Sequence, residues 1–223
     1  MPVLAVDGPG GAGKGTVAKE VADRLGWHLL DSGSLYRITA YAALQQDINL
    51  ESSQDVAAIA RELDVQFVQS DSGVRVILSG SDVSDAIRTE EAGRSASIVA
   101  RDSAVRDALI DRQRAFAEPP GLVADGRDMG SVVFPDAGLK IFLTASVAER
   151  ARRRYKQLKD KGMDVSLPAL SRDMEERDRR DSERAVAPLR ATDDARVLDS
   201  TNLDIQGVVD QVMLWVAEVF PNA

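Results

Sequence analysis

The chain has 223 residues and a mass of 24.1 kDa, with 44% hydrophobic, 29% charged and 4% aromatic residues, which is typical of a soluble globular protein. It contains no cysteine, which excludes disulfides, thiolate zinc sites and cysteine nucleophiles. Its formal net charge of −8 argues against a general nucleic-acid binder, because such proteins need a positive surface to displace counterions.

The hydrophobic pattern argues against a membrane protein. No apolar run approaches the roughly 20 residues of a membrane-spanning helix. The segment Met1–Asp7 has neither a basic region nor a long apolar stretch, so we do not expect a signal peptide. These features predict a cytoplasmic protein.

The first third of the chain alternates strands with helices. Val17, Val21 and Leu25 recur at helical spacing, and Gly26 marks the end of that helix. The predicted elements are, in order, a buried strand at 3–6, a glycine-rich loop, this helix, a strand at 28–30, and a helix from Leu35 through Leu44 with Asp31 or Ser32 as its cap.

The middle of the chain breaks this alternation and predicts an inserted subdomain. Its expected elements are a helix at 52–62, a hairpin of 65–68 and 74–78 with a turn at Ser72–Gly73, and two helices within 83–116.

The alternation resumes after this insertion, with strands at 121–124, 139–143 and 196–198 and helices at 146–161, 167–184 and 205–220. Ser146 with Glu149 predicts a capping box at the start of the first of these helices. Strands separated by helices predict an α/β fold with a parallel central sheet.

The glycine-rich loop carries the first functional signal. Gly8 to Lys14 fits the pattern G-x-x-x-x-G-K, directly after a predicted strand and before a predicted helix. In such a loop the backbone N–H groups surround a phosphate, the helix N-terminus adds its dipole, and the lysine reaches the β and γ oxygens. The pattern predicts a phosphate-binding loop.

Other nucleotide-binding proteins remain as alternatives. Gly8, Gly10 and Gly13 also fit G-x-G-x-x-G, and Asp31 lies at a suitable distance to bind a ribose of a dinucleotide. In a Rossmann dinucleotide site, however, Lys14 would have no role in binding. A GTPase-type switch protein would need an Asn-Lys-x-Asp motif, which the sequence lacks. A non-enzymatic nucleotide-binding scaffold also remains possible.

Arginines are concentrated at 150–154 and 172–184, which in an acidic chain indicates a site for a small polyanion. Arg177, Asp181 and Arg184 share one face of the predicted helix, because they are four and three residues apart. We expect the remaining charges of this helix to form a solvated surface: Arg172, Asp173, Glu175, Arg179 and Glu183.

Three segments, taken with the glycine loop, indicate a family. Asp31–Arg37 reads DSGSLYR, Asp125–Gly130 reads DGRDMG, and Arg177–Arg184 reads RDRRDSER. In this order they resemble the bacterial cytidylate kinases, and the resemblance covers nearly the whole chain. Lys-Gly-Thr at 14–16 is also the form seen in nucleoside monophosphate kinases such as adenylate kinase.

The resemblance implies a P-loop NTPase-type three-layer fold with a parallel central sheet, an inserted monophosphate-binding subdomain and a mobile lid. The core would comprise about 1–45, 118–153 and 185–223, the insert about 46–117, and the lid about 154–184. The implied reaction is transfer of the γ-phosphoryl group of ATP to CMP or dCMP, with Mg²⁺ as cofactor. A UMP-type kinase or a non-kinase NTPase is the alternative. We expect a monomer that binds neither nucleic acid nor membrane.

The resemblance also implies site residues. Those expected at ATP are Gly8, Pro9, Gly10, Gly11, Ala12, Gly13, Lys14, Gly15, Thr16, Arg153 and Arg154, with Arg150 as a further clamp and Thr16 as a metal ligand. Those expected at CMP are Ser32, Arg37, Ser97, Arg106, Arg127, Asp128, Arg177, Asp181 and Arg184. Ser97, Arg106 and Asp128 would read the cytosine. The catalytic residues would be Lys14, Arg127, Arg177 and Arg184.

Overall fold

The computed structural model describes residues 1–70 and 73–221, which divide into two compact units. The first unit comprises Met1–Asp31 and the chain from Gln113 onward, and the second comprises Ser32–Arg112. The second unit therefore begins before the predicted insert at about 46, because helix α2 (Ser32–Gln45) packs against α3 (Ser53–Arg61) and α4 (Glu90–Val99). We describe each unit by itself.

The first unit contains the predicted parallel sheet. Among its described residues the strand order is β2 (His28–Asp31), β6 (Leu122–Gly126), β1 (Val3–Asp7), β7 (Leu139–Thr144) and β8 (Arg196–Asp199). All of these strands pair in parallel, as predicted.

The strand order decides against the Rossmann interpretation. In a Rossmann fold the second strand of the unit lies beside the first. Here β6 lies between β1 and β2, so Asp31 ends a strand that is not the neighbour of β1. The ribose-binding role considered for Asp31 in a dinucleotide site was therefore wrong.

The helices of the first unit follow the predicted positions: α1 (Lys14–Leu25), α6 (Val147–Asp160), α7 (Leu167–Glu183) and α8 (Ile205–Val219). Ser146 caps α6 as expected, since its hydroxyl accepts from the Glu149 N–H at 3.3 Å. The reciprocal half of the capping box was wrong. The Ser146 N–H donates to Thr201 Oγ1 at 2.9 Å, and the Glu149 carboxylate accepts from Arg153 Nε at 2.9 Å.

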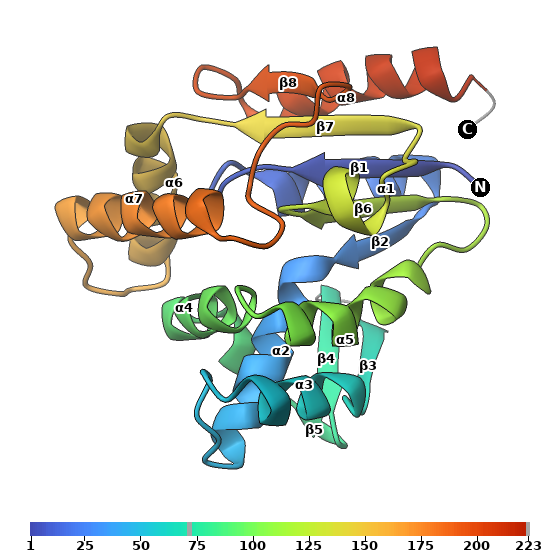
Figure 1. The fold of residues 1–223 in the computed structure, drawn as a ribbon. Helices are drawn as coiled ribbons and strands as arrows, with labels where there is room; N and C mark the ends of the chain where they lie inside the picture. The colour runs from blue at the N-terminus through green and yellow to red at the C-terminus, as the bar shows by residue number, and fades with distance from the viewer. Residues whose placement is uncertain (71–72, 222–223) are drawn as a thin grey trace. The chain divides into compact units, whose positions relative to one another are not determined.

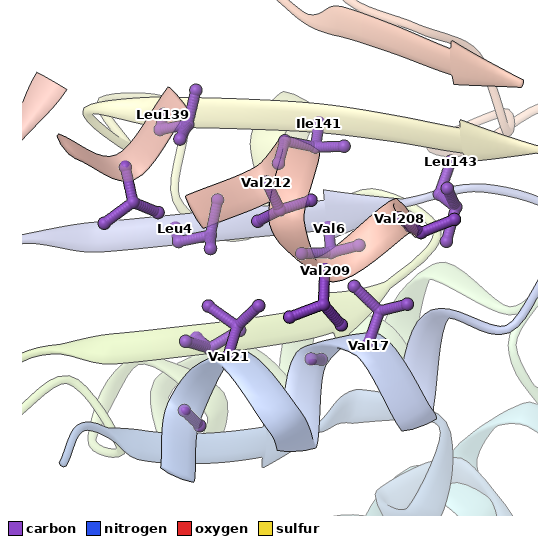
Figure 2. Packing of buried hydrophobic residues seen from close by; sticks show 14 of the residues in the cluster. Leu4, Val6, Val17, Val21, Leu139, Ile141, Leu143, Val208, Val209 and Val212 are labelled. Carbon is purple, nitrogen blue, oxygen red and sulfur yellow. The ribbon is translucent and has the colours of Figure 1, made fainter. Parts of the chain in front are cut away.

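The core of this unit lies between the sheet and the helices α1 and α8. Figure 2 shows side chains of β1 and β7, such as Leu4 and Ile141, facing Val21 of α1 and Val212 of α8. Alternate residues of each strand point to the same face, so Leu4 and Val6 enter this core while Asp7 does not. The apolar layer fixes the sheet on α1 and thereby holds the glycine loop between them.

The second unit combines helices with a small antiparallel sheet: β3 (Val65–Ser70), β4 (Gly73–Leu78) and β5 (Ser81–Asp82). The hairpin was predicted, and its turn at Ser72–Gly73 falls partly outside the described residues. The polar two-residue strand β5 was not predicted. The two helices predicted within 83–116 are α4 and α5 (Ser103–Arg114), preceded by a 3₁₀ turn at Ala86–Arg88.

Across residues 1–70 and 73–221, the structure has no helix with the length and apolarity needed to cross a membrane.

Replacing Leu4 by alanine should lower the free energy of unfolding by about 2–5 kcal/mol, because the side chain is fully buried in this core and its removal leaves a cavity. Chemical denaturation followed by circular dichroism measures the loss. Leu214→Ala is the control, since Leu214 lies on α8 but is 62% exposed; it should change stability by less than about 0.5 kcal/mol. Equal losses for the two variants would contradict the placement of the core.

Candidate active site

The glycine loop joins the end of β1 to the start of α1, as the sequence predicts. Gly8 has a φ of +147°, and a Cβ there would lie 1.9 Å from the Leu143 carbonyl oxygen, so only glycine fits. Lys14 is the first residue of α1. Its Nζ donates to the Pro9 carbonyl at 3.0 Å and lies 3.9 Å from Asp125 Oδ1. The loop thus has the strand–loop–helix geometry that binds phosphate.

The charge of Lys14 is held in a buried position. Lys14 is only 6% exposed to solvent. Burial lowers the pKa of Lys14 to about 7, with a further lowering by the positive charge of Arg127, while Asp125 acts in the opposite direction. Burial likewise raises the pKa of Asp125 to about 6, against the attraction of Lys14. A bound phosphate would supply the negative charge that favours the ammonium form.

A cluster of arginines lies beside this loop. A Cβ on Gly10 would lie 3.5 Å from Arg127 Nη2 and 3.6 Å from Arg177 Cζ, so both guanidinium groups approach the loop backbone. Arg127 Nε donates to Asp181 Oδ2 at 3.1 Å. The buried Arg184 places Nη2 3.5 Å from Oδ1 of the buried Asp128. The structure therefore brings together the predicted residues Lys14, Arg127, Asp128, Arg177, Asp181 and Arg184.

Asp181 is the centre of this cluster. Burial alone would raise the pKa of its carboxyl group, but the charges of Arg127, Arg177 and Arg184 outweigh burial and lower the pKa. Asp181 is therefore an anion that holds the arginines together.

Helix α7 presents two different faces, as its spacing predicts. Arg177 is half-buried and Asp181 is buried. The helix ends at Glu183, one residue earlier than predicted, so the buried Arg184 is its C-cap, with φ −61° and ψ 139° outside the helical region. The residues expected on the solvated surface are all exposed: Arg172, Asp173, Glu175, Arg179 and Glu183. Figure 1 shows α6 and α7 beyond the ends to which the arrows of β1 and β7 point, which is the edge of a parallel sheet where ligands bind.

The arginines of α6 have different partners. The buried Arg150 donates from Nη1 to the Gly10 carbonyl at 3.0 Å and to Asp178 Oδ1 of α7 at 3.1 Å. Arg153 instead donates to Glu149 and to the carbonyls of Ser200 and Leu203, and Arg154 contacts Gln157. Among the arginines expected to clamp ATP, Arg150 hydrogen-bonds to the phosphate-binding loop.

Besides Asp125, which lies beside Lys14, two carboxylates of this region were missed by sequence analysis. Asp178 pairs with Arg150, and Asp7 accepts hydrogen bonds from the backbone of Met129 and Gly130. Both contacts join segments distant in sequence, so no local spacing reveals them. The one available signal was for Asp7, an acidic residue that directly follows a buried apolar strand.

The other residues expected at CMP belong to the second unit. Ser32 and Arg37 lie on α2, Ser97 on α4 and Arg106 on α5. The buried Arg106 donates from Nη1 to the Ala100 carbonyl at 3.2 Å, and its Cζ lies 5.6 Å from the centroid of the Tyr36 ring. Their contact with a nucleotide stays a prediction.

The donor chemistry beside the loop fits Mg²⁺. No group of three or more His, Asp or Glu side chains among the described residues forms a metal cage. However, Mg²⁺ in nucleotide sites takes most of its ligands from phosphates and water and needs only one or two protein oxygens. Two side chains supply such oxygens, the Asp125 carboxylate and the Thr16 hydroxyl. Asp125 Oδ2 would lie 3.3 Å from a Cβ on Gly15, the residue that precedes Thr16.

Binding of metal-free ATP at pH 8 should be accompanied by proton uptake. At this pH Lys14 is mostly uncharged, because its pKa is about 7, and a nearby triphosphate raises the pKa of both Lys14 and Asp125. Calorimetric titration in two buffers with different ionisation enthalpies measures the uptake. Lys14→Met should lower the uptake, with the remainder coming from Asp125. Proton release by the wild-type protein, or an uptake that Lys14→Met leaves unchanged, would contradict the assignment.

Comparison with known proteins agrees with these observations. The sequence matches the family model described as cytidylate kinase over residues 4–218. A cytidylate kinase from Pseudomonas aeruginosa (strain LESB58) is 60% identical over 215 residues, covering 96% of this chain and 94% of the relative. One from Aeromonas salmonicida (strain A449) is 54% identical over 222 residues, covering 100% of this chain and 96% of the relative.

The fold also has solved relatives. The crystal structure of a gluconokinase from Sinorhizobium meliloti 1021 has a TM-score of 0.50 and 14% identity, and covers 99% of this chain and 94% of that chain. This likeness concerns the fold alone, which is of the P-loop kinase type. On the match of nearly its whole length and the identity of its relatives, the chain belongs to the cytidylate kinase family.

Proposed function

We propose that this chain transfers the γ-phosphoryl group of ATP to CMP or dCMP, producing ADP and CDP or dCDP. Membership of the cytidylate kinase family supports this reaction. The structural observation that carries it is the approach of Arg127 and Arg177 to Gly10 of the phosphate-binding loop. Cations from two separate segments gather where a donor and an acceptor phosphate would have to meet.

The donor triphosphate binds to the loop Gly8–Thr16. Backbone N–H groups contact its oxygens without a side chain in between, and Lys14 adds a positive charge at the β and γ oxygens. Arg150 stabilises the loop through its hydrogen bond to the Gly10 carbonyl. Lys14 thus stabilises the charge that spreads over the transferring group.

The acceptor phosphate binds among Arg127, Arg177 and Arg184. Arg127 contacts Asp181 and Arg184 contacts Asp128, so CMP has to share or exchange these carboxylate contacts. The phosphate of CMP is already an anion at neutral pH, and its attack needs no strong general base. The arginines therefore act by alignment and by neutralising the repulsion between two phosphates.

Mg²⁺ is the proposed cofactor, and the Asp125 carboxylate and the Thr16 hydroxyl are the groups that would hold it. When bound, it would supply positive charge to the triphosphate.

The segment at about 154–184 is the proposed lid that excludes water from the reaction. It contains α7, which carries Arg177, Asp178 and Asp181, and Gly162 with a φ of +75° lies between α6 and α7. Water exclusion prevents hydrolysis of ATP in place of transfer. A monomeric, cytoplasmic protein that does not bind nucleic acid stays a prediction from the sequence.

An assay of ADP formation with CMP, dCMP, UMP and AMP as acceptors tests the proposed function. ADP should form fastest with CMP or dCMP and at a much lower rate without an acceptor. ADP formation that does not depend on an acceptor would identify a non-kinase NTPase. A preference for UMP or AMP would also contradict the proposal.

Asp128→Asn should reduce the preference for CMP over UMP by roughly tenfold or more, expressed as the ratio of kcat/KM values. The carboxylate accepts from the cytosine amino group and faces the uracil oxygen unfavourably, whereas an asparagine amide serves both bases. Steady-state kinetics with both acceptors measures the ratio.

The matched control for this change is Asp136→Asn, an exposed aspartate eight residues further along the chain, which should leave the ratio unchanged. An unchanged ratio in Asp128→Asn itself would show that this carboxylate does not read the base.

A further inference from the structure

The carboxylate of Asp7 is committed to the backbone of a distant loop. Asp7 is the last residue of β1 and directly precedes Gly8, and it is only 7% exposed. Its Oδ1 accepts the Met129 N–H and its Oδ2 accepts the Gly130 N–H, each at 2.8 Å. Both oxygens of one buried carboxylate thus hold two consecutive amides of the segment that follows β6.

These amides open a π-helical turn, Met129–Val133. The N–H groups at the start of a helical turn have no partner within it, so Asp7 satisfies donors that would otherwise be buried without one. The other end of the turn is held by Arg114, which donates to the carbonyls of Val133 at 3.0 Å and Val132 at 3.3 Å. Single π-helical turns are frequent at functional sites.

The turn determines the position of Asp128. Its backbone has φ −148° and ψ 26°, outside the helical region, and its carbonyl accepts the N–H groups of Val132 at 2.9 Å and Val133 at 3.2 Å. The following residue, Met129, donates to Asp7. Asp128 is therefore fixed from both sides, and Arg127 immediately precedes it.

The π-helical turn is packed so closely against Asp7 that a small displacement of Asp7 would move the backbone of the turn. A Cβ on Gly130 would lie 3.0 Å from Lys140 Cδ and 3.4 Å from Asp7 Oδ2. Any displacement of Asp7 must therefore be accommodated by the backbone of this segment.

We propose that Asp7 is a positioning residue for acceptor selection. It holds the amides of Met129 and Gly130 so that Asp128 and Arg127 face the pyrimidine nucleotide, and it does not itself contact either substrate. This inference rests on the proposed function, because Asp128 and Arg127 are assigned to CMP there. Through its bond to Gly8, Asp7 also joins the donor loop to the acceptor segment.

Asp7→Asn tests this role. The variant keeps the size of the side chain but offers one oxygen and one NH₂ group, so one backbone N–H faces another donor. The KM for CMP should rise by about 5-fold to 50-fold, and the CMP to UMP ratio of kcat/KM should fall by at least about 3-fold. The KM for ATP should change by less than about 2-fold, because the loop backbone of Gly8–Gly13 keeps its own contacts.

Two further variants separate positioning from stability. Asp204→Ala removes the N-cap acceptor of the Gly207 N–H and should lower the midpoint of chemical denaturation, but it should leave the KM for CMP and the ratio unchanged. Arg114→Met removes the exposed guanidinium group that holds the opposite end of the turn, and it should change both values in the same direction as Asp7→Asn. Arg114→Met is the variant that tests the positioning role if Asp7→Asn does not fold.

The inference is overturned if Asp7→Asn keeps the wild-type KM for CMP and the wild-type CMP to UMP ratio of kcat/KM. If Asp7→Asn does not fold, the same result with Arg114→Met overturns it. It is also overturned if Asp204→Ala reproduces the same kinetic changes, since these would then follow from lost stability. Failure of the wild-type protein to form ADP in a CMP-dependent way would instead overturn the proposed function.

Discussion

The burial of opposite charges at the carboxyl ends of β1 and β6 is the constraint on which this site depends. Lys14 is buried beside Asp125, and neither group would be stable there as an isolated ion. Parallel pairing of β1 with β6 sets the separation of the segments that carry Lys14 and Asp125. The register of this pairing places Asp7 opposite Gly126. The apolar layer of α1, α8 and the sheet then fixes the loop that carries Lys14.

The arginines around Lys14 and Asp125 also need partners of opposite charge. Arg127 contacts Asp181, Arg184 contacts Asp128, and Arg150 contacts Asp178, so each of these three cations has a carboxylate from another segment. Helix α7 supplies Asp178 and Asp181 and thereby connects β6 and α6 to one element. Because losing one partner of a buried pair is costly, a nucleotide phosphate has to replace the carboxylate contact that it displaces. The carboxylates thus compensate the positive charge of the arginine cluster.

Sequence patterns predicted the parts of this arrangement that depend on local spacing. The strand–helix alternation, the loop Gly8–Lys14 and the shared face of Arg177 and Asp181 on α7 all follow from short repeats along one element. They did not predict the partners of Asp7 and Asp178, which lie across the fold, or the π-helical turn after β6. The choice between a phosphate-binding loop and a Rossmann loop needed the strand order, since both patterns fit the same glycines.

A crystal structure with CMP and a non-hydrolysable ATP analogue tests the central claim most directly. The account predicts the triphosphate on the backbone N–H groups of Gly8–Thr16, and the CMP phosphate within hydrogen-bond distance of Arg127, Arg177 or Arg184. A CMP phosphate that contacts none of these three arginines would contradict it.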